Sequence, residues 1–340
     1  MSKIKKFIYL TCIPTLVLLL LIEFAIRIHK FGFDAAISPA IMNSLFGKPE
    51  YFQKSKFPEI VYELRPNLNT IFAKVPFRTN KFGMRDKDFS KSKPETIIRY
   101  ACVGDSLTMG RGVKLSGVFH TRLEDRMNHE MKPKKFEFLN FGVGGYDLRQ
   151  YIGVIKEKVL KFDPDYIILG FCGNDTIIQP DDYYKPRTFS GNHYGNLFLH
   201  SWTKEWIHER YIRLRKYNNK EMIVKKEKQT NELISIKPIS DYLYEKLNVV
   251  AKISKKTKIP IIIVHLTYNG GEIVINNKLK EVCRSLDIPF LNTGNFFPND
   301  PVGNYIKYCI FRHDGHPNSD ANEIFADKIF DFIKNNKFYN

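Results

Sequence analysis

The stretch IIRYACVGDSLT, residues 97–108, decides the fold class, because it joins a mostly apolar run to a turn and then to a helical stretch. Ile97–Val103 has the length and apolar content of one buried strand, and Gly104 and Asp105 end it. Ser106 therefore stands where a strand passes into a helix. Because ligands of α/β folds bind at the carboxyl ends of parallel strands, the stretch predicts a sheet strand with a serine at its functional end.

Further apolar runs repeat this pattern and alternate with helical stretches. Phe119, Leu123 and Met127 recur at the spacing of one helix face, and apolar residues do the same within 148–159 and 242–253. This alternation predicts βαβ units around a central parallel sheet. The strands are expected at residues 97–103, 136–141, 166–171, 259–266 and 288–291.

The N-terminus holds an apolar segment. Phe7–Ile22 is a charge-free run of 16 residues with lysines before it and Glu23 and Arg27 after it. A helix of that length spans about 24 Å, close to the thickness of a bilayer core. We expect a transmembrane signal anchor over residues 7–28, after a short tail of residues 1–6. A cleaved signal peptide is the alternative, although no small-residue cleavage site follows directly.

The rest of the chain divides by composition. Residues 29–95 are rich in turn formers and predict a membrane-proximal segment with short strands. The sheet-containing domain is expected over residues 96–340, with an insertion at 180–240 that is rich in tyrosine, tryptophan and basic residues. An insertion of this size is typical of a cap beside an active site or of a partner surface. The lysines before the apolar run weakly favour an extracytoplasmic location for this domain.

The net charge of +17 has two interpretations. Lysines spread over the whole surface are the simpler one, and attraction to anionic lipid or acidic polysaccharide is the other. The basic residues are scattered and no nucleic-acid-binding module is present, so no nucleic-acid partner is predicted. The five cysteines have no CxxC spacing, so buried free thiols are expected. The sequence indicates no protein partner.

Three more short motifs stand at predicted strand ends or before a helix. The glycines of NFGVGG (140–145) can offer N–H groups to a developing negative charge, and so can the side-chain amide of Asn174 in GND. His316, in DGHPN (314–318), has a pKa suited to a base that activates a serine hydroxyl. Singly, each motif also fits an ordinary turn or helix cap. A final helix is expected to begin near Asn318 or Ser319.

Together these blocks resemble the SGNH, or GDSL-type, hydrolase family over roughly residues 97–335. The resemblance rests on their order along the chain: GDSLTMGRGV (104–113), NFGVGG (140–145), GND (173–175) and DGHPN (314–318). It implies a flavodoxin-like three-layer α/β/α fold, here preceded by a transmembrane helix, and ester chemistry without a cofactor or metal. The stretch TNKFGMRDKDF (79–89) also resembles the lead-in of membrane-anchored members.

Carried over residue by residue, the resemblance implies Ser106 as the nucleophile and His316 as its base. The backbone N–H groups of Ser106 and Gly145 and the side chain of Asn174 would form the oxyanion hole.

The acid that orients the histidine is expected to be Asp314, two residues before His316. Many family members carry that acid three residues before the histidine, where this chain has His313. His313 and His316 also form an H-x-x-H pair, but no further cluster of acids or histidines favours a metal site.

The sequence therefore predicts a membrane-bound serine esterase that hydrolyses O-acetyl or short-chain esters of small molecules, often of carbohydrates. Transfer of the acyl group to a sugar hydroxyl is the alternative, since it uses the same residues. A non-catalytic binding protein that keeps the fold is a third and less favoured hypothesis, because all four block residues are present.

Overall fold

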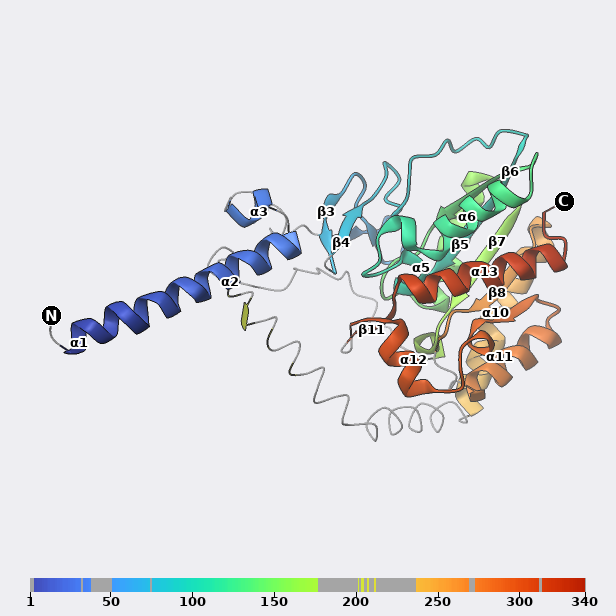
Figure 1. Ribbon diagram of the computed structural model, residues 1–340. Coiled ribbons are helices and arrows are strands. Elements are labelled where there is room, and N and C mark those ends of the chain that lie inside the picture. Colours follow the sequence, from blue (N-terminus) through green and yellow to red (C-terminus); the bar gives the residue numbers. More distant parts are fainter. Residues whose placement is uncertain are drawn as a thin grey trace. The chain divides into compact units, whose positions relative to one another are not determined.

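The computed structural model describes most of the chain and divides it into two compact units (Figure 1). One unit contains residues 1–50 and 190–218, and the other contains residues 51–189 and 219–340. The described residues are 3–31, 33–37, 51–73, 75–176, 201, 203, 204, 207, 211, 237–268, 273–311 and 314–339. Most of the predicted insertion at 180–240 lies outside them.

The smaller unit contains an apolar helix formed by α1 (Lys3–Phe7), a π-helical turn (Ile8–Cys12) and α2 (Ile13–Phe31). Pro14 has no N–H to donate, and the N–H of Ile13 bonds to the carbonyl of Ile8 in the longer π pattern. The stretch Lys5–His29 is long and apolar enough to cross a membrane, a property it shares with signal sequences. A short helix, α3 (Phe33–Ile37), follows.

The larger unit is built around five parallel strands in the order β6-β5-β7-β8-β9. This is the 2-1-3-4-5 order of flavodoxin-like folds, which reverses between β5 and β7. The predicted parallel sheet is confirmed, and the predicted strand ends differ from the observed ones by at most two residues. The strands are β5 (Ile97–Gly104), β6 (Lys135–Asn140), β7 (Tyr166–Phe171), β8 (Ile261–His265) and β9 (Phe290–Asn292).

Helices cover both faces of the sheet, which confirms the three-layer α/β/α architecture (Figure 1). Alternate strand residues enter opposite cores: Ala101 and Val103 pack on one face, and Tyr100 and Cys102 on the other. The first core contains α7 (Leu148–Glu157), α10 (Lys237–Thr257) and α11 (Ile273–Ser285). The second contains α6 (Phe119–Glu130), α12 (Pro301–Tyr308) and α13 (Ser319–Asn335).

Residues 51–95 belong to the larger unit and pack on the α7 side of the sheet. Their contact with α7 is direct, because Gln150 Nε2 donates to the carbonyl of Ile60 at 2.8 Å. They form two antiparallel pairs, β1 (Phe52–Lys54) with β2 (Tyr62–Leu64) and β3 (Asn69–Phe72) with β4 (Val75–Arg78).

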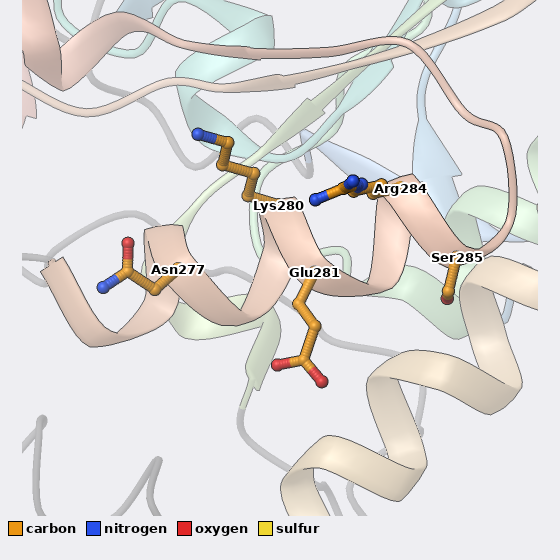
Figure 2. Close-up of a pocket in the computed structure, with 5 residues that line it drawn as sticks. All are labelled: Asn277, Lys280, Glu281, Arg284 and Ser285. Atoms are coloured by element: carbon orange, nitrogen blue, oxygen red, sulfur yellow. The ribbon is translucent and has the colours of Figure 1, made fainter.

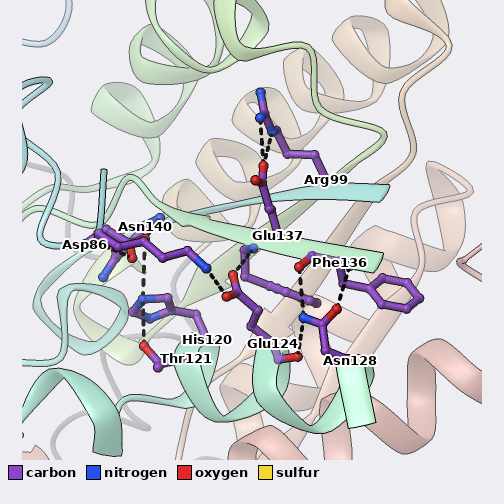
Figure 3. Close-up of polar contacts among 11 residues, drawn as sticks. Asp86, Arg99, His120, Thr121, Glu124, Asn128, Phe136, Glu137 and Asn140 are labelled. Atoms are coloured by element: carbon purple, nitrogen blue, oxygen red, sulfur yellow. Dashed lines mark hydrogen bonds and ion pairs between the residues drawn. The ribbon is translucent and has the colours of Figure 1, made fainter. Parts of the chain in front are cut away.

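Side chains occupy the outer edge of β6, where the strand has no neighbouring strand in the sheet (Figure 3). Asn128 of α6 accepts from the N–H of Phe136 and donates to its carbonyl, each at 3.0 Å. Glu124 accepts from the N–H of Phe138 at 2.8 Å, and Asp86 accepts from that of Asn140 at 2.9 Å. These contacts satisfy backbone groups that an exposed edge would offer to another chain.

Asp86 makes the stability of this edge depend on pH. Burial raises its pKa to about 7, well above the value of about 3.9 for an unfolded aspartate. The folded state therefore binds the proton more tightly, and the free energy of unfolding falls as the pH rises from about 4 to about 7. We expect Asp86→Asn, which cannot titrate, to flatten this decrease in urea unfolding of the full chain in detergent. The exposed Asp88→Asn is the control, and an unchanged pH slope in Asp86→Asn would contradict the assignment.

Candidate active site

Ser106 is the first residue of α5 (Ser106–Met109), a single helical turn directly after β5. Asp105 caps this turn, because its Oδ1 accepts from the N–H of Leu107 at 2.8 Å. Gly110, at φ 79°, ends the turn in the left-handed region that favours glycine. Gly104 allows the strand to approach closely, since a Cβ there would lie 2.0 Å from Thr108 Oγ1.

Arg85 holds the loop that follows this turn. Its guanidinium is buried and donates to the carbonyls of Met109, Gly110 and Val113, the first at 2.9 Å. Burial lowers its pKa to about 10, so the group still carries its charge at neutral pH. Arg85 was not among the predicted site residues, although it lies in the GMRD of the lead-in stretch. Its contacts link that stretch to the serine turn.

His316 lies on a hairpin formed by β10 (Cys309–Phe311) and β11 (Asp314–Pro317). The hydroxyl of Tyr268 donates to the carbonyl of Gly315 at 2.7 Å, which holds the second strand. Asn318 then caps α13 by accepting from the N–H of Ala321 at 3.0 Å, as the sequence predicted. Contacts of the residues just before and just after His316 in the chain therefore hold the histidine in place.

The structure brings Ser106 and His316 together across 210 residues of sequence. Ser106 Oγ lies 2.7 Å from His316 Nε2, within hydrogen-bond distance. Ser106 is 8% exposed and His316 is partly exposed, so the pair lies at the protein surface without being fully solvated.

Asp105 joins the serine turn to the end of β7. Its Oδ2 lies 3.2 Å from Ser106 Oγ, 3.2 Å from Cys172 Sγ and 3.3 Å from Asn174 Nδ2. The thiol of Cys172 also contacts Asn174 Oδ1. Asn174 belongs to the 3-10 turn Gly173–Thr176 and is exposed, so its amide is held at the surface by buried neighbours. β5 and β7 flank the reversal in strand order, which places these groups at the ligand-binding position of the fold.

Gly145 lies in the turn after β6, at a φ of 81° that favours glycine. The backbone of its neighbour Gly144 is close to the serine, since a Cβ on Gly144 would lie 3.8 Å from Ser106 Cβ. The Tyr62 hydroxyl donates to the carbonyl of Gly144 at 3.0 Å, so β2 also supports this turn.

Two predicted positions are not described in full. The backbone of Asp314 is in β11, but its side chain is outside the described part of the chain, and so is all of His313. The assignment of Asp314 as the orienting acid therefore stays a prediction.

A second carboxyl group, Asp175, is fully buried behind the site. It accepts from the Tyr151 hydroxyl and from the N–H of Cys172, each at 2.9 Å. Burial raises its pKa well above the usual value, and the nearby Asp105 raises it further. Asp175 therefore holds a proton more readily than an exposed aspartate does.

A hollow of about 500 Å³ lies along α11 and is lined by polar side chains of this one helix (Figure 2). None of the predicted site residues lines it. Its lining residues are Asn277, Lys280, Glu281, Arg284 and Ser285.

Removing the guanidinium of Arg85 is expected to destabilise the protein strongly, because three backbone carbonyls lose a charged donor. We expect Arg85→Met to lower the free energy of unfolding by about 3–5 kcal/mol in urea titrations of the full chain in detergent. Arg78→Met is the matched control, since Arg78 is exposed and donates to Asn69 Oδ1 on the same hairpin. Equal effects of the two substitutions would show that the loop does not depend on Arg85.

Comparisons with known proteins give one family match and several structural matches at low identity. The chain matches solved structures at low identity, and no curated protein sequence matches it. A two-domain esterase active on acetylated mannans is 14% identical, with 71% of this chain and 50% of that chain covered and a TM-score of 0.46. This chain thus spans half the length of that esterase.

Two further structures are matched over nearly their full length. An acetyl xylan esterase, AlAXEase, is 14% identical, with 69% of this chain and 98% of that one covered and a TM-score of 0.41. TesA is 12% identical, with 70% and 98% covered and a TM-score of 0.42.

The family comparison covers well over half of the chain. The pattern of the GDSL-like Lipase/Acylhydrolase family matches residues 102–324, from within β5 to within α13. All four short motifs lie inside these bounds. The chain belongs to the GDSL-like lipase/acylhydrolase family.

Proposed function

We propose that this chain is a membrane-anchored serine esterase that hydrolyses acyl esters of carbohydrates, with Ser106 as nucleophile and His316 as base. The observation that carries the proposal is the separation of 2.7 Å between Ser106 Oγ and His316 Nε2. A serine hydroxyl is a weak nucleophile until a neighbouring base takes its proton, and a neutral imidazole at this distance can do so.

Asp105 and His316 compete for the single hydroxyl proton of Ser106. The contact with His316 is shorter, at 2.7 Å against 3.2 Å to Asp105 Oδ2. The carboxylate of Asp105 also accepts hydrogen bonds from Leu107 and Asn174, so it has other donors. Transfer of the Ser106 proton to His316 is the step that starts the reaction. The distances therefore favour the productive arrangement before substrate binds.

The reaction has two stages. Ser106 Oγ attacks the ester carbonyl carbon while its proton passes to His316 Nε2, and the tetrahedral intermediate expels the alcohol, which takes that proton. Water then attacks the acyl-enzyme with His316 again as base, which releases the carboxylic acid and restores the serine hydroxyl.

The oxyanion of each intermediate would be held by the N–H groups of Ser106 and Gly145 and by Asn174 Nδ2. Ser106 is the first residue of α5, and the first N–H groups of a helix have no acceptor within it. Its amide can therefore point toward the reacting carbonyl oxygen. Such donors act mainly in the transition state, where the negative charge develops.

The substrate class follows from the family resemblance, which implies acylated molecules and often carbohydrates. We propose that Phe7–Ile22 anchors the enzyme, with the catalytic unit outside the cytoplasm. The test of the substrate is the rate of acetate release by the full chain in detergent. We expect faster release of acetate from acetylated xylo- and manno-oligosaccharides than from p-nitrophenyl acetate. Activity on p-nitrophenyl acetate without activity on either oligosaccharide would reject carbohydrate esters as the substrate.

Ser106 is expected to react covalently with a fluorophosphonate, because the adjacent His316 activates its hydroxyl. Intact-mass analysis of the full chain should show one adduct, which Ser106→Ala abolishes. Ser116→Ala, at an exposed serine on the loop after α5, should label like the parent. Persistent labelling of Ser106→Ala would identify a different nucleophile.

Asp105→Asn is expected to lower kcat by on the order of tenfold to a hundredfold, with little change in KM. Asparagine can still cap α5, but its amide nitrogen would replace an oxygen that accepts from Ser106 and Asn174, at a cost of about 1–3 kcal/mol. Asp300→Asn is the matched control, because Asp300 caps α12 in the same way through the N–H of Gly303. A kcat equal to that of the control would remove Asp105 from the site.

A further inference from the structure

Exposed apolar side chains are concentrated in the smaller unit. Outside the N-terminal apolar helix, the four most exposed large hydrophobic residues of the described chain all belong to this unit. Their exposed fractions are 58% for Phe33, 52% for Ile37, 56% for Ile207 and 56% for Tyr211. Tyr244, Phe296 and Val274, in the larger unit, reach at most 48%.

These four residues, here called the apolar collar, have helical spacing. Phe33 and Ile37 are the first and last residues of α3, four positions apart. Ile207 and Tyr211 are helical and also four positions apart, and Thr203 precedes Ile207 by the same interval. Residues at this spacing in one helix share a face, so α3 presents the exposed side chains of Phe33 and Ile37 on one side. Ile207 and Tyr211 add two further exposed apolar side chains.

Hydrogen bonds join Thr203, four positions before Ile207, to the apolar helix. Glu23 Oε2 accepts from both the N–H and the hydroxyl of Thr203, at 2.8 and 2.7 Å. Glu23 Oε1 accepts from Arg27 at 2.9 Å. The carboxylate is thus satisfied by three donors while its side chain is only 16% exposed. An acid so fully paired fixes the position of Thr203 against α2.

Glu23 also indicates where along the apolar helix the hydrocarbon core of the membrane would end. It is the first charged residue after the 16-residue charge-free run, and charged side chains lie outside the hydrocarbon core or at its boundary. Phe33 of α3 packs edge-on against Phe24, the next residue along α2, with 6.3 Å between ring centroids. Phe33 and Thr203 are therefore both held against the helix at the level where it would leave the core.

We infer that the apolar collar inserts into the lipid interface of the membrane that the apolar helix crosses, which makes these four residues a second membrane contact. The inference rests on the proposed membrane anchor. Burial of apolar side chains at the headgroup boundary stabilises such a contact, and tyrosine is suited to that boundary because its ring is apolar and its hydroxyl is polar. The net charge of +17 favours anionic lipid in the same leaflet.

The chain contains its own probe of this surface, since its only two tryptophans, Trp202 and Trp206, are within the segment that carries Thr203 and Ile207. The full chain is reconstituted in phosphatidylcholine and phosphatidylglycerol vesicles whose acyl chains are brominated at a shallow or a deep position. We expect bromine to quench the tryptophan fluorescence, more strongly from the shallow position, while aqueous iodide quenches weakly. Strong iodide quenching without bromine quenching would overturn the inference, and this is also the result if a protein partner normally covers the collar.

Variants test the collar itself. Ile207→Ser combined with Tyr211→Ser is expected to lower bromine quenching by roughly twofold and to raise iodide quenching, because the segment loses its apolar contact. Phe296→Ser, at an exposed aromatic of the larger unit, should leave both signals unchanged. Parent-like bromine quenching in the double variant would refute the assignment of these residues.

Vesicle flotation separates this inference from the proposed anchor. A chain that does not float with the vesicles refutes the anchor and the collar together. A chain that floats but whose tryptophans respond only to iodide refutes the collar alone. Neither readout depends on esterase activity, so a failure of the proposed reaction is seen separately in the fluorophosphonate experiment.

Discussion

The carboxylate of Asp105 is the interaction on which the arrangement of the site depends. One oxygen caps the turn that begins with Ser106, and the other faces the serine hydroxyl, the Cys172 thiol and the amide of Asn174. β5 and β7 are adjacent in the sheet, so a single acid at the end of β5 can reach groups that follow β7. The order of the strands brings these groups close together, and the hydrogen bonds of Asp105 fix their positions relative to one another.

The lead-in stretch supports the same region through two consecutive residues with opposite charges. Arg85 donates to carbonyls of the loop after α5, and Asp86 accepts from the backbone of Asn140 at the end of β6. One short segment therefore fixes the loops that follow two neighbouring strands. Both side chains are buried, which explains why their pKa values move toward the neutral forms, downward for Arg85 and upward for Asp86.

Much of the fold and the Ser106–His316 pair could be predicted, because strand periodicity and catalytic chemistry leave local signals. The roles of Arg85 and Asp86 could not be predicted from the sequence. Their hydrogen-bond partners are distant in the sequence, and only folding brings these partners close to the buried side chains. Helix α11 was missed although Ile275, Leu279 and Val282 have the spacing of one face. The β10–β11 hairpin was missed because DGHPN contains residues typical of a loop, and its pairing depends on a partner strand.

The division into two units places the proposed catalytic residues and the proposed membrane contact in different parts of the chain. The described site groups, from Asp105 to His316, lie in the larger unit, and the hydrogen bonds from Ser106 to His316 and from Asn174 to Asp105 are made within it. Glu23, Thr203 and the apolar collar lie in the smaller unit, where Thr203 donates to Glu23 and Phe33 packs against Phe24. The proposed membrane contact and the proposed catalytic pair therefore involve different residues. Under these proposals the anchor would act on which substrates the enzyme meets, whereas the ends of β5, β6 and β7 and the hairpin that carries His316 would determine the rate of the chemical step.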